Sequence, residues 1–180
     1  MDDVNHDHDL VIERGGDLFE EATATFDRCR RHRYLLTRRW SDAPPLTFCM
    51  LNPSTADAFA TDPTAERCLR RARREGAGGL VIVNLFALRA TDPTTLASAD
   101  DRIGLHGDAF LNWHLATATG PVIVAWGAHG ALGGRGREVL HLLRAAAVVP
   151  LCLGVTKVGH PRHPLYVKAD TELAPYRTQF

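Results

Sequence analysis

The sequence predicts a single α/β domain with three layers, in which a central, mostly parallel sheet lies between two layers of helices. Four short apolar segments have the composition of buried strands, and segments with helical spacing of apolar residues separate most of them. Continuous apolar strands that alternate with helices are typical of a parallel sheet covered on both faces. The four segments are residues 46–51, 80–84, 121–126 and 148–153.

The length and composition agree with this fold class. The chain has 180 residues, which fits one domain of ordinary size. Hydrophobic residues make up 45% and charged residues 23%, a composition that excludes collagen-like, coiled-coil and wholly disordered proteins. We expect residues 1–17 to form an acidic, disordered tail and residues 18–180 to form the domain.

Turn and cap signals predict the remaining elements. Residues 34–36 and 46–51 are expected to form two strands joined by the proline-containing turn at residues 41–45. Gly76 is placed to end the first helix as its C-cap. The three expected helices cover about residues 64–75, 100–117 and 137–147.

Charge is distributed unevenly although the net charge is zero. Before residue 28 there are nine acidic residues and one basic residue, Arg14, so the remainder of the chain has a net charge of +8. Nineteen of the 21 basic residues are arginines, which suit bidentate contacts with phosphate. A GC-rich genome, which encodes basic residues as arginine, is the alternative explanation. We expect the body of the domain to face an anion while the acidic segment screens it.

Several common chemistries lack their sequence signals. The four cysteines are far apart, and the prolines beside His160 and His163 break any helix that would align these two on a metal. No G-x-G-x-x-G, G-K-[ST] or G-x-S-x-G motif supports a dinucleotide fold, an NTPase or a serine hydrolase. Residues 130–136, GALGGRG, could cradle a phosphate or form a plain flexible loop. We therefore expect no metal and no cofactor.

The chain carries no signal for a membrane. No apolar run approaches the roughly 20 residues needed to cross a bilayer. The acidic start also differs from the basic start of a signal peptide. We expect a cytoplasmic monomer.

Each of the four apolar strands runs into a loop of polar residues. The first loop begins with Asn52, the second with Asn84, the third with Gly127 and the fourth with Gly154. Because parallel strands have their carboxyl ends at one edge of a sheet, these loops should meet in one ligand-binding cleft.

Five motifs in these loops resemble an uncharacterised bacterial family, the domain of unknown function 1643. The resemblance runs from about Ala24 to Tyr166, and the family name implies no activity. The motifs, in chain order, are NPSTAD, DPT, VNLFALRATDP, AWGAHG and HPRHPLY.

The same loops are similar, in the same order, to the uracil-DNA glycosylase superfamily. Residues 50–54 resemble its first loop, and residues 83–89 resemble its apolar strand that ends in Asn. Residues 125–127 resemble its third motif, and residues 160–164 resemble its H-P-S-P motif. The resemblance implies a uracil-DNA glycosylase-like fold. It also implies a DNA-repair hydrolase of base excision, which cleaves the N-glycosidic bond of a damaged or modified base.

Cleavage of that bond needs a polar group to position water and a donor to stabilise the departing base. By resemblance, Asn52 positions the water, and Asp57 or Asp62 supplies the carboxylate that Asn52 lacks. His163 or His160 is the donor to the leaving base, and His163 is favoured because HPLY is the more typical string of the family.

The resemblance also suggests binding roles. Asn84 suits the Watson–Crick edge of an extruded base, and Phe86 could stack on that base. Ser54 stands where strict uracil enzymes have an aromatic residue that excludes thymine, which implies a roomier pocket. The residues expected to hold phosphate are Arg89, Lys157 and Arg162, and the candidates for a base-flipping wedge are Leu165 and Tyr166.

Alternatives stay open at this stage. The chain could be a non-catalytic module that binds a nucleotide or nucleic acid in the same cleft, or an enzyme of another class that acts on a nucleotide. DNA is the expected partner, with RNA or a free nucleotide as alternatives. Residues 52–55 could be a plain turn, Asn84 could cap its strand, and Trp126 is interpreted as a core residue.

Overall fold

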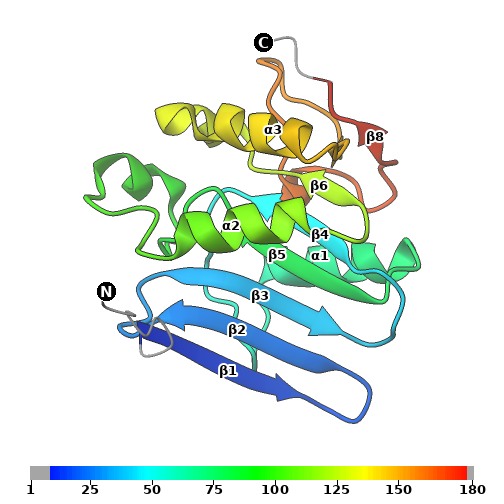
Figure 1. The fold of residues 1–180 in the computed structure, drawn as a ribbon. Coiled ribbons are helices and arrows are strands. Elements are labelled where there is room, and N and C mark those ends of the chain that lie inside the picture. The colour runs from blue at the N-terminus through cyan, green and yellow to red at the C-terminus, as the bar shows by residue number, and fades with distance from the viewer. Residues whose placement is uncertain (1–8, 178–180) are drawn as a thin grey trace.

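A computed structural model of the chain describes residues 9–177 (Figure 1). Its centre is one eight-stranded sheet with the strand order β1-β2-β3-β5-β4-β6-β7-β8. The strands are β1 (Leu10–Gly16), β2 (Glu21–Asp27), β3 (Arg33–Arg39), β4 (Leu46–Met50), β5 (Gly79–Asn84), β6 (Val122–Val124), β7 (Leu151–Cys152) and β8 (Ala174–Pro175). The α-helices are α1 (Pro63–Arg74), α2 (Gly107–Ala116) and α3 (Arg135–Ala145), and the 3₁₀ helices are η2 (Pro93–Ser98), η3 (Ala128–Gly134) and η4 (Pro164–Tyr166).

The sheet is mixed rather than mostly parallel, which corrects the expected fold class. β4 pairs in parallel with β5 and β6, and β6 pairs in parallel with β7. The neighbouring pairs β1-β2, β2-β3, β3-β5 and β7-β8 are antiparallel. β1 and β2 escaped sequence analysis because they mix small, polar and charged residues, as strands with one face toward solvent do.

The expected hairpin between residues 34–36 and 46–51 is also wrong. β5 lies between β3 and β4 in the sheet. The backbone N–H groups of Trp40 and Ser41 donate to the carbonyl of Gly78, directly before β5. The proline-containing segment after β3 therefore carries the chain past β5 to the next position in the sheet.

Residues 10–16, which sequence analysis placed in a disordered tail, form β1. This strand pairs with β2 along its whole length. Glu13 of β1 forms an ion pair with Arg30, so the acidic segment is tied to the arginine-rich body. Residues 1–8 of the expected tail lie outside the described residues.

Helices lie on both faces of the central strands (Figure 1). α1 covers one face, and its buried residues join a core cluster that includes Phe48 and Ile82. α2 and α3 cover the other face, over a second cluster that includes Cys49 and Val83. Because successive residues of a strand point to opposite faces, each central strand contributes to both clusters.

α1 begins and ends close to where its cap signals predict. Asp62 is the N-cap, and its Oδ1 accepts a hydrogen bond of 2.8 Å from the Ala65 N–H. Gly76 follows the helix with a φ of +73°, a conformation that glycine adopts without strain.

α2 begins at Gly107 rather than near residue 100. Asp101 turns the chain before the helix, because its Oδ1 accepts hydrogen bonds from the N–H groups of Ile103 and Gly104.

None of the helices in residues 9–177 is both long enough and apolar enough to span a membrane.

β1 lies directly against the loop that joins β4 to α1. A Cβ atom on Gly15 would be 2.5 Å from the carbonyl oxygen of Ala58, so the two backbones approach as closely as glycine permits. The carboxylate of Glu13 accepts a long hydrogen bond of 3.5 Å from the Ala58 N–H. The N-terminal strand therefore supports this loop.

We expect Gly15→Ala to lower the free energy of unfolding by about 1–3 kcal/mol, because the loop backbone must move to admit the methyl group. Arg14 is exposed on the same strand, so Arg14→Ala is the control and should change the free energy by less than about 0.5 kcal/mol. Urea unfolding measures both variants. Equal stability of the two would show that β1 does not support the loop.

Candidate functional site

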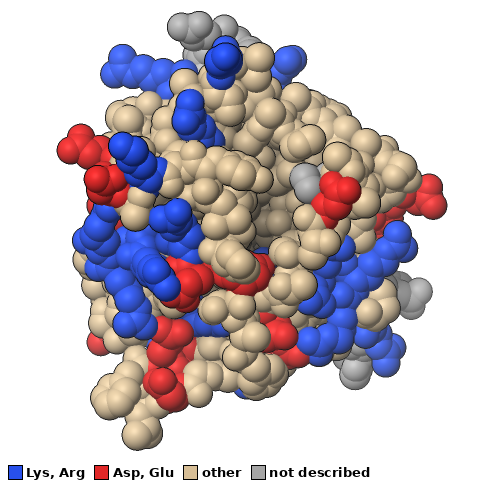
Figure 2. Space-filling model, turned by 180° about the vertical axis from the view of Figure 1, so that it is seen from behind, with Lys and Arg blue, Asp and Glu red and all other residues tan. Residues whose placement is uncertain are grey.

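A cavity of about 810 Å³ opens where the four strand-end loops meet, on the face of the sheet that α1 covers. Every loop contributes to its lining: Asn52 follows β4, Asn84 ends β5, Trp126 follows β6 and His163 follows β7. Figure 2 shows this side of the molecule, where basic side chains gather on two sides of a hollow. The meeting of the loops agrees with the expectation from the strand ends.

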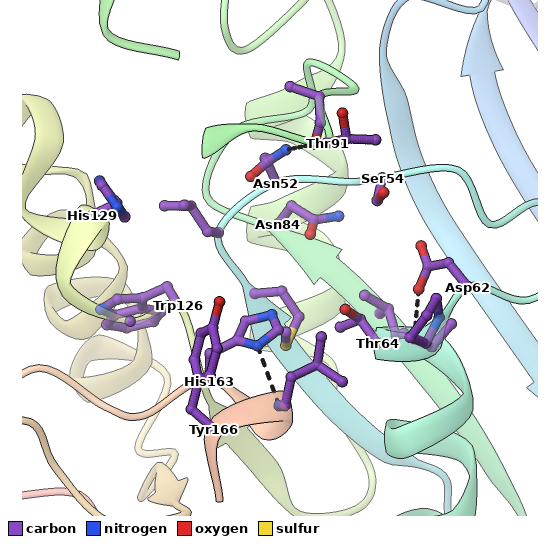
Figure 3. Close-up of a pocket in the computed structure, with 18 of the residues that line it drawn as sticks. Asn52, Ser54, Asp62, Thr64, Asn84, Thr91, Trp126, His129, His163 and Tyr166 are labelled. Atoms are coloured by element: carbon purple, nitrogen blue, oxygen red, sulfur yellow. Dashed lines mark hydrogen bonds between the residues drawn. The ribbon is translucent and has the colours of Figure 1, made fainter. Parts of the chain in front are cut away.

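Asn84 places a buried amide in the cavity. The residue is 6% exposed, and neither its Oδ1 nor its Nδ2 has a hydrogen-bond partner among residues 9–177. In Figure 3 its side chain lies between Asn52 and His163. Because an unsatisfied buried polar group costs about 1–3 kcal/mol, the geometry favours a ligand that supplies the missing bonds.

Asn52 presents an acceptor to the cavity. Its Nδ2 donates to the carbonyl oxygens of Ala90, at 2.7 Å, and Pro53, at 3.0 Å. These bonds fix the orientation of the amide and leave Oδ1 to accept a hydrogen bond from water or from a ligand. Asn52 therefore lines the site as predicted, with its donor used inside the protein.

His163 presents a donor to the cavity. Its Nδ1 accepts a hydrogen bond of 3.3 Å from the N–H of Leu165 (Figure 3). Burial lowers the pKa of His163, and the negative charge of Asp62 offsets this only in part, so the ring is neutral at pH 7. A neutral ring that accepts at Nδ1 carries its proton on Nε2, which can donate to a ligand.

His160, the other candidate donor, does not line the cavity. Its backbone N–H donates to the hydroxyl of Thr156 at 3.1 Å and so shapes the loop before η4. Of the two histidines that sequence analysis left open, the fold brings His163 to the site.

The two candidate carboxylates differ in the same way. Asp62 lines the cavity and is 8% exposed, but its oxygens accept hydrogen bonds from the N–H groups of Ala65 and Ala56. Asp57 lies outside the lining, where its Oδ1 accepts from the N–H groups of Phe59 and Ala60. Both carboxylates thus stabilise the backbone of the first loop.

Phe86 and Arg89, which were expected to stack on the base and to hold phosphate, lie outside the lining. Phe86 is 3% exposed and belongs to the core under α2 and α3. The guanidinium of Arg89 donates to the carbonyls of Ser54 and Thr55, and it stacks on the ring of Phe26 at 5.2 Å. Arg89 therefore stabilises the backbone of the first loop from outside the cavity lining.

The other predicted residues do line the cavity. Ser54 belongs to its wall, and Lys157 and Arg162 come from the fourth loop. The wedge candidates Leu165 and Tyr166 lie at the rim, with Tyr166 80% exposed. Charged and exposed apolar side chains therefore stand together at the mouth.

Sequence analysis missed Arg33, the first residue of β3. Its side chain lines the cavity although the residue is 3% exposed. Nη1 donates to the carbonyl of Ala56 at 2.6 Å, whereas Nε has no partner in the described part of the chain. Burial lowers the pKa of Arg33 to about 10, so it remains charged at neutral pH. The sequence gives no sign that this one arginine, in a run of arginines, is buried. Its burial depends on the strand order of the sheet.

Two of the four glycines of GALGGRG, Gly130 and Gly136, pack against Trp126. A Cβ on Gly130 would lie 1.9 Å from Cδ1 of Trp126, and one on Gly136 would lie 3.1 Å from its Nε1. Trp126 is 2% exposed, in agreement with its interpretation as a core residue, and it also lines the cavity. Close contact with the indole explains these two glycines without a phosphate.

The described part of the chain has no cluster of metal ligands, and three of its four cysteines are buried while Cys29 is exposed. Within residues 9–177, no three His, Cys, Asp or Glu side chains are grouped to hold a metal ion. Burial raises the pKa of Cys49 and of Cys68, so both thiols stay protonated.

A family model described as "Protein of unknown function (DUF1643)" matches residues 33–165. The match begins at Arg33 and covers the motifs from NPSTAD to HPRHPL, which confirms the first of the two resemblances. No curated protein and no solved structure matches the chain.

We expect Asn84→Leu to raise the free energy of unfolding by about 1 kcal/mol, because an apolar group of similar size replaces an unpartnered amide. Asn52→Leu is the matched control and should lower the free energy by about 0.5–1.5 kcal/mol, because it removes the bonds to Ala90 and Pro53. Guanidinium unfolding compares the two. An equal loss of stability in both variants would mean that the amide of Asn84 is already satisfied.

His163 in the folded protein should titrate below its ordinary pKa of 6.5 and carry its neutral proton on Nε2. The unfolded chain then takes up the proton first, so the stability contributed by His163 is complete above about pH 6.5 and is lost as the pH falls toward the folded pKa. Long-range ¹H–¹⁵N correlation spectra measure both properties, with the urea-unfolded chain as reference. A folded pKa at or above the unfolded one contradicts this account of the ring.

Proposed function

The chain belongs to the DUF1643 family, and we propose that it hydrolyses the N-glycosidic bond of a damaged or modified nucleobase. The observation that carries this proposal is the buried, unpartnered amide of Asn84. An amide offers one acceptor and two donor hydrogens in a plane, which complements the polar edge of a base.

The bond that breaks joins the base nitrogen to C1′ of the sugar. Positive charge develops on the sugar and negative charge on the base, and a neutral His163 with a proton on Nε2 can donate a hydrogen bond to that anion. Asn52 Oδ1 can accept a hydrogen bond from the water that adds to C1′. Because an amide takes no proton, the proton lost by the water passes to solvent.

The size and rim of the cavity favour a modified base within DNA. A volume of about 810 Å³ exceeds what an unmodified pyrimidine fills, and Ser54 leaves the wall open where an aromatic residue would narrow it. Lys157 and Arg162 at the rim can contact phosphates, and exposed Leu165 and Tyr166 can take the place of a flipped base. The order of the loop motifs, which is similar to that of the uracil-DNA glycosylase superfamily, supports the same reading.

A specific observation favours a second candidate, a module that binds a nucleotide or nucleic acid without cleaving it. Asp62 already accepts two backbone hydrogen bonds, and Asp57 lies outside the cavity. A carboxylate ready to act as general base is therefore missing from the described lining. The base-binding role of Asn84 is common to both candidates.

Base release, read by mass spectrometry, tests the proposal on single- and double-stranded DNAs that carry uracil, mismatches, alkylated bases and bulky modified bases. Asn52→Ala and His163→Ala should each lower the rate by about 10²–10⁴-fold. His160→Ala changes the same loop outside the cavity and should retain activity.

Two outcomes decide between the candidates. Release by the wild type that depends on His163 and not on His160 supports hydrolysis. If no substrate loses its base while binding persists, the module is the better description. Binding that weakens steeply with salt then indicates a polymer, and a flat response indicates a small ligand.

A further inference from the structure

Arg33 differs from the other buried arginines of the described chain. Arg38 pairs with Glu20 at 3.5 Å, and Arg71 pairs with Glu75 at 3.1 Å. Arg33 is the most buried of the three, and within residues 9–177 no carboxylate oxygen lies within 4.0 Å of its guanidinium. It is also the one of the three that lines the cavity.

The protein satisfies only part of this guanidinium. Nη1 donates to the carbonyl of Ala56, and Nε is buried with no partner among the residues that the structure describes. Asp62 attracts the charge from a distance, but its own oxygens accept the N–H groups of Ala56 and Ala65. A buried positive charge of this kind is costly unless a counter-charge approaches it.

The surroundings of Arg33 suit an oxyanion. The first residues of α1, Pro63 and Thr64, line the same cavity, and a helix N-terminus favours negative charge. Arg33 and Asn84 belong to the paired strands β3 and β5 at the same end of the sheet, because Leu36 lies opposite Ile82 in the antiparallel register. Two unsatisfied polar side chains thus share one cavity.

We propose that Arg33 binds an oxyanion of the ligand, either a carboxylate on the modified base or a phosphate of the nucleotide. This proposal rests on the proposed function, from which it takes the contact between Asn84 and a base. It narrows the substrate class to bases or nucleotides that carry a negatively charged group into the cavity. A planar guanidinium recognises either oxyanion through paired hydrogen bonds.

Calorimetry with two pairs of probes tests this inference. 5-Carboxyuracil is compared with thymine, and deoxyuridine monophosphate with deoxyuridine, so each pair differs in one oxyanion. We expect the wild type to bind the anionic member of one pair about 10- to 100-fold more tightly, as a hydrogen bond to a charged group allows. The pair that shows the preference identifies the source of the oxyanion.

Arg33→Gln should abolish this preference, because glutamine can still donate to Ala56 but carries no charge. Arg38→Gln is the matched control, since Arg38 lies on the same strand and donates to the carbonyl of Asp57 at 2.7 Å without lining the cavity. Arg33→Lys keeps the charge and loses the planar guanidinium, so it should retain part of the preference. This variant replaces Arg33→Gln in the test if Arg33→Gln does not fold.

The failure of this inference can be separated from the failure of the proposed function. If the anionic and neutral probes bind equally in wild type and variants, the oxyanion role is overturned while base binding stands. In another outcome no base binds, but inorganic phosphate raises the thermal midpoint of the wild type and of Arg38→Gln and not that of Arg33→Gln. The oxyanion site then stands, and base recognition is overturned. Absence of any Arg33-dependent effect with all probes overturns the inference.

Discussion

The loop between β4 and α1 forms one side of the cavity, and its buried backbone groups find their partners in side chains from other elements. Such groups must be satisfied in a loop without a helix or strand. Arg33 donates to the carbonyl of Ala56 at 2.6 Å, and Arg38 from the same strand donates to that of Asp57 at 2.7 Å. Arg89 reaches the carbonyl of Ser54 from the second loop at 3.2 Å. These arginines, whose abundance first suggested phosphate, hold the wall of the site in place.

The acidic N-terminal segment also has a structural role, because its side chains are partners for basic groups from other elements. Glu20 lies within ion-pair distance of Arg38 and Arg73, at 3.5 and 2.6 Å, and Asp27 accepts from the ring of His32 at 2.8 Å. Acids from the first 27 residues therefore pair with basic side chains of β3, of α1 and of the segment before β3. The net charge of zero does not reveal these pairs, because most of their members are far apart in the sequence and adjacent only in the fold.

Sequence reasoning located the cavity because its signals are local. Continuous apolar segments mark β4, β5 and β6, and the first polar residues after them line the site. α1 was predicted to within about one residue, since Asp62 and Gly76 are cap signals of the helix itself. β1 and β2 were missed because strands exposed on one face give a weak pattern. Arg33 was missed, and Phe86 and Arg89 were misplaced, because the direction of a side chain depends on strand order and on the path of the loop.

Trp126 stands in the cavity wall with an indole that has little room to turn. Gly130 and Gly136 lie against it, and the ring of Tyr176 meets it edge-on with the centroids 6.4 Å apart. The other two tryptophans have different surroundings: Trp113 is 62% exposed, and Trp40 donates to the carbonyl of Ala77 beneath Arg73. Trp126 is therefore a built-in fluorophore in a fixed orientation, and a change in its emission when a ligand enters would report contact with the indole rather than rotation of the ring.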